Sequence, residues 1–335
     1  MKLFWQVNMR LVVLIAVVFV CQHLAVAQQK GDKDKQPTEI TSDDFPRTRD
    51  ITDDIKNGET AFVFKAKPNF RLKRTAPRVK HIPAVVAKTP ANKTTFKLPA
   101  DTKSPEGWEQ IGVTFWRMVP ETKSVPGDKV TARMLVQESG TEYTPQRVAA
   151  GTAFKTGDKV RLSFETPRTG YLYVIDREIY LGGKVGEPYL IFPTRSARGG
   201  DNRVQPGWVI DIPGQSDRVP FFTLKSPNPN WRGELLTVIV SPAPLSDIGM
   251  PDKPSPISPA LVAALEDKYL RDASEYEQQG TEGKNYTKAE KEAGSDGKRQ
   301  LTQTDPYPQT MYRVKMKPKE PMMINLDLRV SEARP

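Results

Sequence analysis

Short segments with apolar residues at every second position dominate the middle of the chain. Ile111, Val113 and Phe115 show this period of two, which is typical of β-strands with one buried face. Nearly continuous apolar runs at 171–175 and 189–192 predict central strands that are covered on both faces. The predicted strands lie at 111–116, 160–165, 171–175, 189–192, 208–212, 221–224 and 235–240.

Turn-forming residues separate these predicted strands. Clusters of glycine, proline, asparagine and aspartate stand at 155–157, 167–170, 182–183, 198–201 and 227–230. Short strands at this spacing are typical of a sandwich or a barrel. The sequence therefore predicts an all-β fold over residues 106–245, an antiparallel sandwich or immunoglobulin-like module.

The pattern becomes helical within residues 246–300. Ser258 can cap a helix that has Pro259 in its first turn, and apolar residues then recur at spacings of three and four. These apolar residues are Leu261, Leu265, Tyr269, Ala273 and Tyr276. They predict an amphipathic helix that packs on the sandwich.

Two further elements are predicted near the C-terminus. Thr287 and Glu290 have the spacing of a capping box, which predicts a second short helix ending near Gly294. Alternating residues on both sides of a turn at 317–321 predict a hairpin within 301–330. Its strands are predicted at 312–316 and 322–330. We expect this hairpin to return to the sheet and close the domain.

The first 27 residues carry the pattern of a secretory signal peptide. Lys2 and Arg10 precede an apolar run at 11–20, and Ala25-Val26-Ala27 provides small residues before a cleavage site. We expect cleavage after Ala27 and export to the periplasm or the extracellular space. An uncleaved membrane anchor and a lipoprotein modified at Cys21 are the alternatives. The apolar run is shorter than the roughly 20 residues that a bilayer core needs.

Cleavage would leave a chain with no cysteine and one histidine, His81. Such a chain lacks the side chains of Ser-His-Asp and Cys-His catalysis, of His/Cys metal sites and of haem or iron–sulfur ligation. Gly182-Gly183 and Gly199-Gly200 lack the helix and lysine of a phosphate loop. We therefore expect no cofactor, no metal and no enzymatic activity.

One pair of acids keeps an enzymatic alternative open. Asp176 and Glu178 stand two residues apart at the end of a predicted strand and therefore share a face. Two carboxylates in a cleft can cleave a glycosidic bond, so a carboxylate-dependent glycan hydrolase is one interpretation. A solvated strand end beside Arg177 is the other.

Positive charge is concentrated in a proline-rich arm at 65–103, within a predicted disordered linker at 28–105. The arm holds eight lysines, three arginines and one aspartate, so its net charge of +10 equals that of the whole chain. Five prolines and the absence of a strand or helix period predict an extended conformation. The candidate binding residues of the arm are Lys65, Lys67, Arg71, Lys73, Arg74, Arg78 and Lys80.

The arm has two interpretations. It is either a solvated spacer or a segment that attracts an anionic surface or polymer through clustered Lys and Arg. Aromatic residues that could stack on bases are sparse in it, so we expect no nucleic acid partner.

Residues 152–242 carry a series of motifs in a fixed order. They are Gly-Asp-Lys-Val-Arg-Leu-Ser at 157–163, Gly-Tyr-Leu-Tyr-Val-Ile-Asp at 170–176, Tyr-Leu-Ile-Phe-Pro at 189–193, Asp-Asn-Arg-Val at 201–204, Ile-Pro at 212–213 and Gly-Glu-Leu-Leu-Thr-Val-Ile-Val at 233–240. This stretch resembles the bacterial domain of unknown function 4384, whose members share a Leu-Phe-Pro strand end, an Asp-Asn loop and a following Ile-Pro. The Leu-Phe-Pro element appears here as Ile-Phe-Pro.

The resemblance implies a small β domain without an established reaction, found in exported bacterial proteins. The partner would then be an unknown envelope protein or an anionic envelope polymer, with membrane contact at most peripheral. The predicted function is an exported, non-enzymatic interaction domain. The alternative is an envelope-attached adaptor whose basic arm binds cell-wall or membrane polymer.

The loop that contains the Asp-Asn motif is the candidate recognition site on the folded domain. Three arginines on one loop suit the binding of a carboxylate or a phosphate. Alternatively, Asp201 and Asn202 bond their own backbone in an Asx turn that fixes the entry into the next strand. The candidate residues of this loop are Arg195, Arg198, Asp201, Asn202 and Arg203.

Overall fold

The computed structural model describes residues 39–40, 49, 51, 62–66, 107–120, 134–136, 141–287, 290 and 300–331. Contacts divide these residues into two units. In the small unit Glu39 pairs with Thr302 through one antiparallel bridge. The large unit holds the described residues from Ile40 to Leu301 and from Asp305 onward, and it contains both β-sheets.

The larger sheet has nine strands within the described residues, all paired antiparallel. Its main path runs β1 (Phe62–Ala66), β13 (Ala273–Gln278), β14 (Thr310–Met316), β2 (Gly107–Pro120), β4 (Thr141–Val148) and β3 (Met134–Val136). The other edge of β2 pairs with β5 (Lys159–Glu165), which also pairs with β9 (Val209–Ile212) and β10 (Phe222–Thr223). The long strand β2 is therefore the centre of this sheet.

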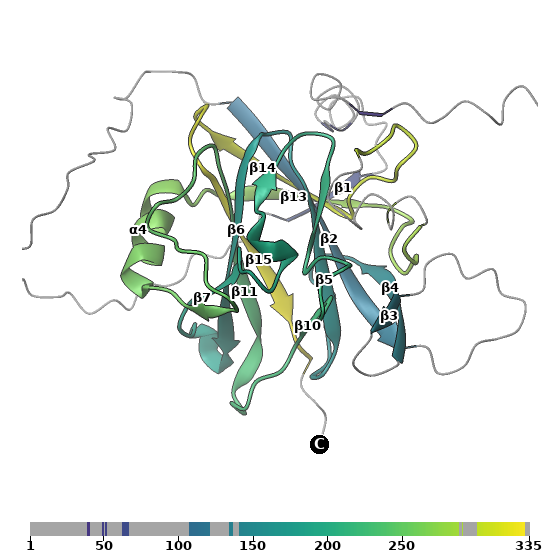
Figure 1. The fold of residues 1–335 in the computed structure, drawn as a ribbon, viewed down its shortest axis with the longest axis horizontal. Helices are drawn as coiled ribbons and strands as arrows, with labels where there is room; N and C mark the ends of the chain where they lie inside the picture. Colours follow the sequence, from purple (N-terminus) through teal and green to yellow (C-terminus); the bar gives the residue numbers. More distant parts are fainter. Residues whose placement is uncertain are drawn as a thin grey trace, which may run out of the picture. The chain divides into compact units, whose positions relative to one another are not determined.

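The smaller sheet has six described strands. Its path runs β12 (Ser255–Pro256), β7 (Tyr189–Phe192), β6 (Gly170–Tyr180), β11 (Trp231–Ser241) and β15 (Met322–Arg329), and β8 (Arg203–Val204) also pairs with β6. Two single-turn helices, η1 (Leu181–Gly183) and η2 (Arg198–Gly200), lie in the connections. The two long neighbours β6 and β11 form the body of this sheet (Figure 1).

The two sheets pack face to face around one apolar core. Phe115 and Phe164 of the larger sheet belong to the same buried cluster as Val174, Leu236 and Ile324 of the smaller sheet. Each such side chain contributes about 1.5–3 kcal/mol when it leaves water. The all-β sandwich that the alternating pattern predicts is confirmed.

Helix α4 (Pro259–Tyr269) covers the outer face of the smaller sheet. The Ser258 hydroxyl accepts a hydrogen bond from the Leu261 N–H at 3.3 Å, which confirms the predicted N-cap. Val262 and Tyr269 pack on Ile175 and other outer-face residues, and α4 lies on the side of this sheet that faces away from β2 and β5 (Figure 1).

Three predictions about elements are wrong. The helix ends at Tyr269 and does not reach Tyr276, because residues 273–278 form β13, which pairs with strands on both of its edges. Part of the predicted linker, Phe62–Ala66, is strand β1. The predicted C-terminal hairpin is absent from the described residues, because β14 and β15 join different sheets.

Beside these differences, the predicted capping box of Thr287 and Glu290 is confirmed. The Glu290 N–H donates to the Thr287 hydroxyl at 3.1 Å, and the Thr287 N–H donates to the Glu290 carboxylate at 2.9 Å. Glu290 also forms an ion pair with the buried Arg147 of β4. The capping box is thus attached to the larger sheet.

Candidate functional site

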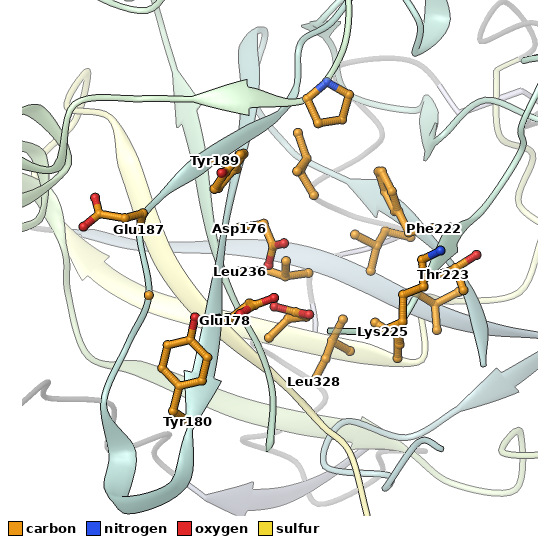
Figure 2. A pocket seen from close by; sticks show the side chains of 17 residues that line it. Asp176, Glu178, Tyr180, Glu187, Tyr189, Phe222, Thr223, Lys225, Leu236 and Leu328 are labelled. Carbon is orange, nitrogen blue, oxygen red and sulfur yellow. Dashed lines mark hydrogen bonds between the residues drawn. The ribbon is translucent and has the colours of Figure 1, made fainter. Parts of the chain in front are cut away.

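A cavity of about 520 Å³ lies between the two sheets. The ends of β6 and β11 form one wall, and β5 with the β10 segment forms the other. Figure 2 shows acidic side chains near the middle, with Tyr180 and Tyr189 on one side and Phe222, Thr223 and Lys225 on the other.

The β-pleat directs three acids into this cavity. Asp176 and Glu178 on β6 are in phase with Val174, whose side chain lies in the core between the sheets. Glu234 on β11 is in phase with Leu236 and pairs directly with Glu178 across the two strands. The regular strand therefore continues past the apolar core and presents carboxyl groups where the sheets leave a space.

Asp176 and Glu234 form a dyad within hydrogen-bonding reach of each other. Glu234 is only 7% exposed, and its Oε1 accepts a hydrogen bond from the Trp231 indole N–H at 3.0 Å. Glu234 Oε2 and Asp176 Oδ1 are buried and have no donor among the residues that the structure describes. A proton shared between the two carboxyl groups would supply one donor to the pair.

The environment of the dyad favours the protonated form. Burial above all, with the neighbouring charges of Asp176 and Glu178, raises the pKa of Glu234 to about 9. Burial also raises the pKa of Asp176 to about 7, with a smaller contribution from the charge of Glu178. Ionisation of both carboxyl groups at this short distance is unfavourable without a compensating positive charge.

Glu178 is held by the next inward residue of its own strand. The Tyr180 hydroxyl donates a hydrogen bond to Glu178 Oε2 at 2.6 Å. This bond is the main cause that raises the pKa of Tyr180 to about 12. Glu178 is therefore oriented by Tyr180, while Asp176 and Glu234 are oriented by each other.

The remaining walls are mainly apolar. Leu162, Leu236 and Leu328 line the inner part of the cavity, and the aromatic rings of Tyr189 and Phe222 stand nearer the surface. Lys225 is the basic residue among the described lining residues, and it is exposed. A ligand in the cavity would thus contact acidic side chains on one wall and aliphatic side chains in the inner part.

Ion pairs and hydrogen bonds hold the candidate loop at 195–203 in place. Arg195 pairs with Asp252 at 2.7 Å, and Arg203 pairs with Asp201 at 2.8 Å. The Asp201 carboxylate also accepts from the Arg203 backbone N–H at 3.3 Å, which is the geometry of an Asx turn.

The other two residues of the loop are also anchored. Asn202 donates to the Leu172 carbonyl at 3.1 Å, and the Arg198 backbone N–H donates to Asp217. The arginines Arg195 and Arg203 thus already have carboxylate partners. Binding of an anion by this loop stays a prediction.

Only Lys65 of the seven candidate arm residues lies within the described residues, exposed on β1. Lys67, Arg71, Lys73, Arg74, Arg78 and Lys80 lie outside them, as does the predicted signal peptide. In the part of the chain that is described, no helix is long and apolar enough to span a bilayer. No group of three or more His, Cys, Asp or Glu in that part is arranged to hold a metal ion.

Comparison with known proteins gives no relative: no protein-family model, no curated protein and no solved structure matches the chain. The candidate site therefore rests on its own geometry.

Proposed function

We propose that the protein is an exported, non-enzymatic binding module of the bacterial envelope, and that its ligand binds in the cavity between the two sheets. The observation that carries this proposal is the buried acidic dyad that lines an open cavity. Buried polar atoms without a partner destabilise a fold by about 1–3 kcal/mol each. Groups retained at such a cost beside an apolar core are typical of functional sites.

The size of the cavity agrees with this proposal. Its volume of about 520 Å³ falls within the roughly 300–1,000 Å³ of sites for small molecules. Such a site would hold a compact ligand or one side chain of a protein partner.

A substitution at the mouth tests the proposal without disturbing the core. Thr223 is exposed and lines the cavity, so Thr223→Trp should fill the entrance. Val219 is 43% exposed and does not line the cavity, so Val219→Trp is the matched control. We expect at least one class of small molecules to raise the melting temperature of the wild type and of Val219→Trp, but not of Thr223→Trp.

The measurement is a thermal-shift screen of amines, carboxylic acids, sugars and nucleotides, followed by calorimetry on the classes that stabilise the protein. Equal stabilisation of both tryptophan variants would place binding elsewhere. The absence of any stabilising class would contradict a small-molecule site.

A glycan hydrolase is the second candidate, because the cavity contains the acids that such an enzyme needs. Retaining and inverting enzymes separate their two carboxyl groups by about 5–5.5 Å and about 6.5–9.5 Å. Asp176 and Glu234 are closer than that, since they are within hydrogen-bonding reach. The remaining combinations are the cross-strand pair of Glu178 and Glu234 and the predicted pair of Asp176 and Glu178. Turnover of chromogenic glycosides that Glu178→Gln abolishes would support this candidate, and binding without turnover would argue against it.

A further inference from the structure

We propose that the cavity recognises a cationic group, an ammonium or guanidinium carried on an aliphatic chain. This inference rests on the proposed function and specifies the chemistry of its ligand.

Acidic residues line one side of the cavity. Asp176, Glu178 and Glu234 come from two adjacent strands, and Glu187 lies at the rim. The basic residue among the described lining residues is Lys225. An anionic ligand would be repelled by Glu178 and Glu187 and would oppose ionisation of the dyad, which is unfavourable.

The unpaired oxygens require a donor. Glu234 Oε2 and Asp176 Oδ1 are buried, lack a donor within the described part of the chain and belong to residues that line the cavity. An ammonium group supplies three N–H donors and a positive charge, and a guanidinium supplies five. A neutral ligand can satisfy the hydrogen bonds of a protonated dyad, but it leaves the charge of Glu178 without compensation.

The aromatic and aliphatic walls fit the rest of such a ligand. Tyr189, which is 44% exposed, and Phe222 line the cavity on either side of the acids (Figure 2). Aromatic faces attract a cation by about 0.5–2 kcal/mol. Leu162, Leu236 and Leu328 provide apolar surface for a chain of methylene groups.

Proton release is the expected consequence of cation binding. The dyad carries a proton at neutral pH because burial raises the pKa of Asp176 to about 7 and that of Glu234 to about 9. A cation replaces this proton. The charged and titratable groups that face the dyad are Glu178, Tyr180, Glu187 and Lys225, with Arg177 nearby on β6. We therefore expect the affinity to increase at least about tenfold between about pH 6 and pH 8.

The test compares probes of equal length and different charge by isothermal titration calorimetry. They are 1,5-diaminopentane, the neutral 1,5-pentanediol and the anionic glutarate. Nα-acetyl-lysine amide, the fourth probe, represents a lysine side chain of a protein partner. We expect the diamine to bind and the diol and glutarate not to bind. Binding of the lysine derivative as tightly as the diamine would assign the site to a protein side chain, and weaker binding would assign it to a free amine.

Three variants of the whole mature chain complete the test. Glu234→Gln should weaken diamine binding by about tenfold or more, because it removes a charge-assisted hydrogen bond. Lys225→Gln should strengthen binding, because it removes a competing cation from an exposed position. Glu282→Gln changes an exposed acid that does not line the cavity and should leave the affinity unchanged. The melting temperature of each variant shows that it is folded.

Either of two results in which a probe binds would overturn this inference. One is tighter binding of the diol or glutarate than of the diamine, and the other is an unchanged diamine affinity in folded Glu234→Gln together with an unchanged affinity in Lys225→Gln. Either result leaves the proposed function intact when Thr223→Trp still blocks binding of the probe that does bind. Failure of every probe would also overturn the inference, and the tryptophan variants in the thermal-shift screen would then decide the proposed function separately.

Discussion

At the scale of single residues, the acidic dyad has an energetic cost that depends on pH. Asp176 and Glu234 lie in the cavity at the end of an apolar core, where ionised carboxylates lose most of their solvation. Their raised pKa values mean that the folded protein holds protons that the unfolded chain releases above about pH 4. The free energy of unfolding must therefore fall as the pH rises from about 4 through about 9.

The variant Glu234→Gln should remove much of this pH dependence. Glutamine has nearly the shape of the protonated glutamic acid, so we expect wild type and variant to be similarly stable at about pH 5. At about pH 9 the wild type carries adjacent buried charges that the variant lacks, and we expect the variant to be more stable by about 2 kcal/mol. Urea unfolding at about pH 5, 7 and 9 measures the difference. A constant difference across this range would show that Glu234 is ionised throughout.

The sequence predicts two of the three acids that β6 and β11 direct into the cavity. Asp176 and Glu178 stood out because they are two residues apart on one strand. Glu234 was missed because the strand was predicted to begin at residue 235, whereas β11 begins at Trp231. The signal was nevertheless present: Glu234 is in phase with Leu236 and Val238, which makes it an acid at an inward-facing position.

At the scale of elements, alternation predicted where strands lie but not which strands pair. The strand at 189–192 and the body of every other predicted strand are present, because a period of two indicates one buried face and a continuous apolar run indicates two. The pairing of β14 with β2 and of β15 with β11 joins segments that are far apart in the sequence. The alternating pattern identifies the buried face of a strand but not the strand with which it pairs. The predicted hairpin is therefore wrong, although both of its predicted strands are present.

Strand β1 shows a second limit of the same reasoning. It is five residues long and carries an exposed edge residue, Phe64, so its pattern is too short to distinguish it from the linker around it. Its stability comes from tertiary contacts: Phe62 packs with Ile51 and Met311 and meets the ring of Tyr307 at 5.6 Å. The polar strand β13 is likewise a strand because it has partners on both edges.

Substitution of the two phenylalanines of β1 tests whether this strand belongs to the folded domain. Phe62 is 6% exposed, and Phe62→Ala should lower the free energy of unfolding by about 3 kcal/mol. Phe64 is 52% exposed, and Phe64→Ala should lower it by less than about 1 kcal/mol. Chemical denaturation of both variants measures the two effects. Equally small changes in the free energy of unfolding would show that residues 62–66 belong to the predicted linker.

At the scale of the whole molecule, the chain combines a neutral folded part with a strongly basic segment. The net charge of +10 resides in residues 65–103, so residues outside this arm have no net charge. The arm begins on β1, an edge strand of the larger sheet, where Lys65 is exposed. The cavity, by contrast, is lined by acids. A binding module of this kind would use the arm for an anionic envelope polymer and the cavity for a cationic group, so the two sites would not compete for one ligand.

On the proposal that the arm binds an anionic envelope polymer, attachment of the mature protein should depend on salt through the arm alone. Clustered Lys and Arg bind polyanions by releasing counterions, and this gain disappears as the Debye length falls from about 10 Å at 0.1 M salt to about 3 Å at 1 M. We expect the protein to sediment with envelope fragments at low ionic strength and to dissociate at high ionic strength.

Changing Lys65, Lys67, Arg71, Lys73, Arg74, Arg78 and Lys80 together to glutamine should abolish sedimentation at low salt. Changing the exposed Lys184 and Arg195 of the folded domain should not. Protein that stays in solution at every salt concentration would identify the arm as a spacer, and sedimentation that persists at high salt would assign attachment to another surface of the chain.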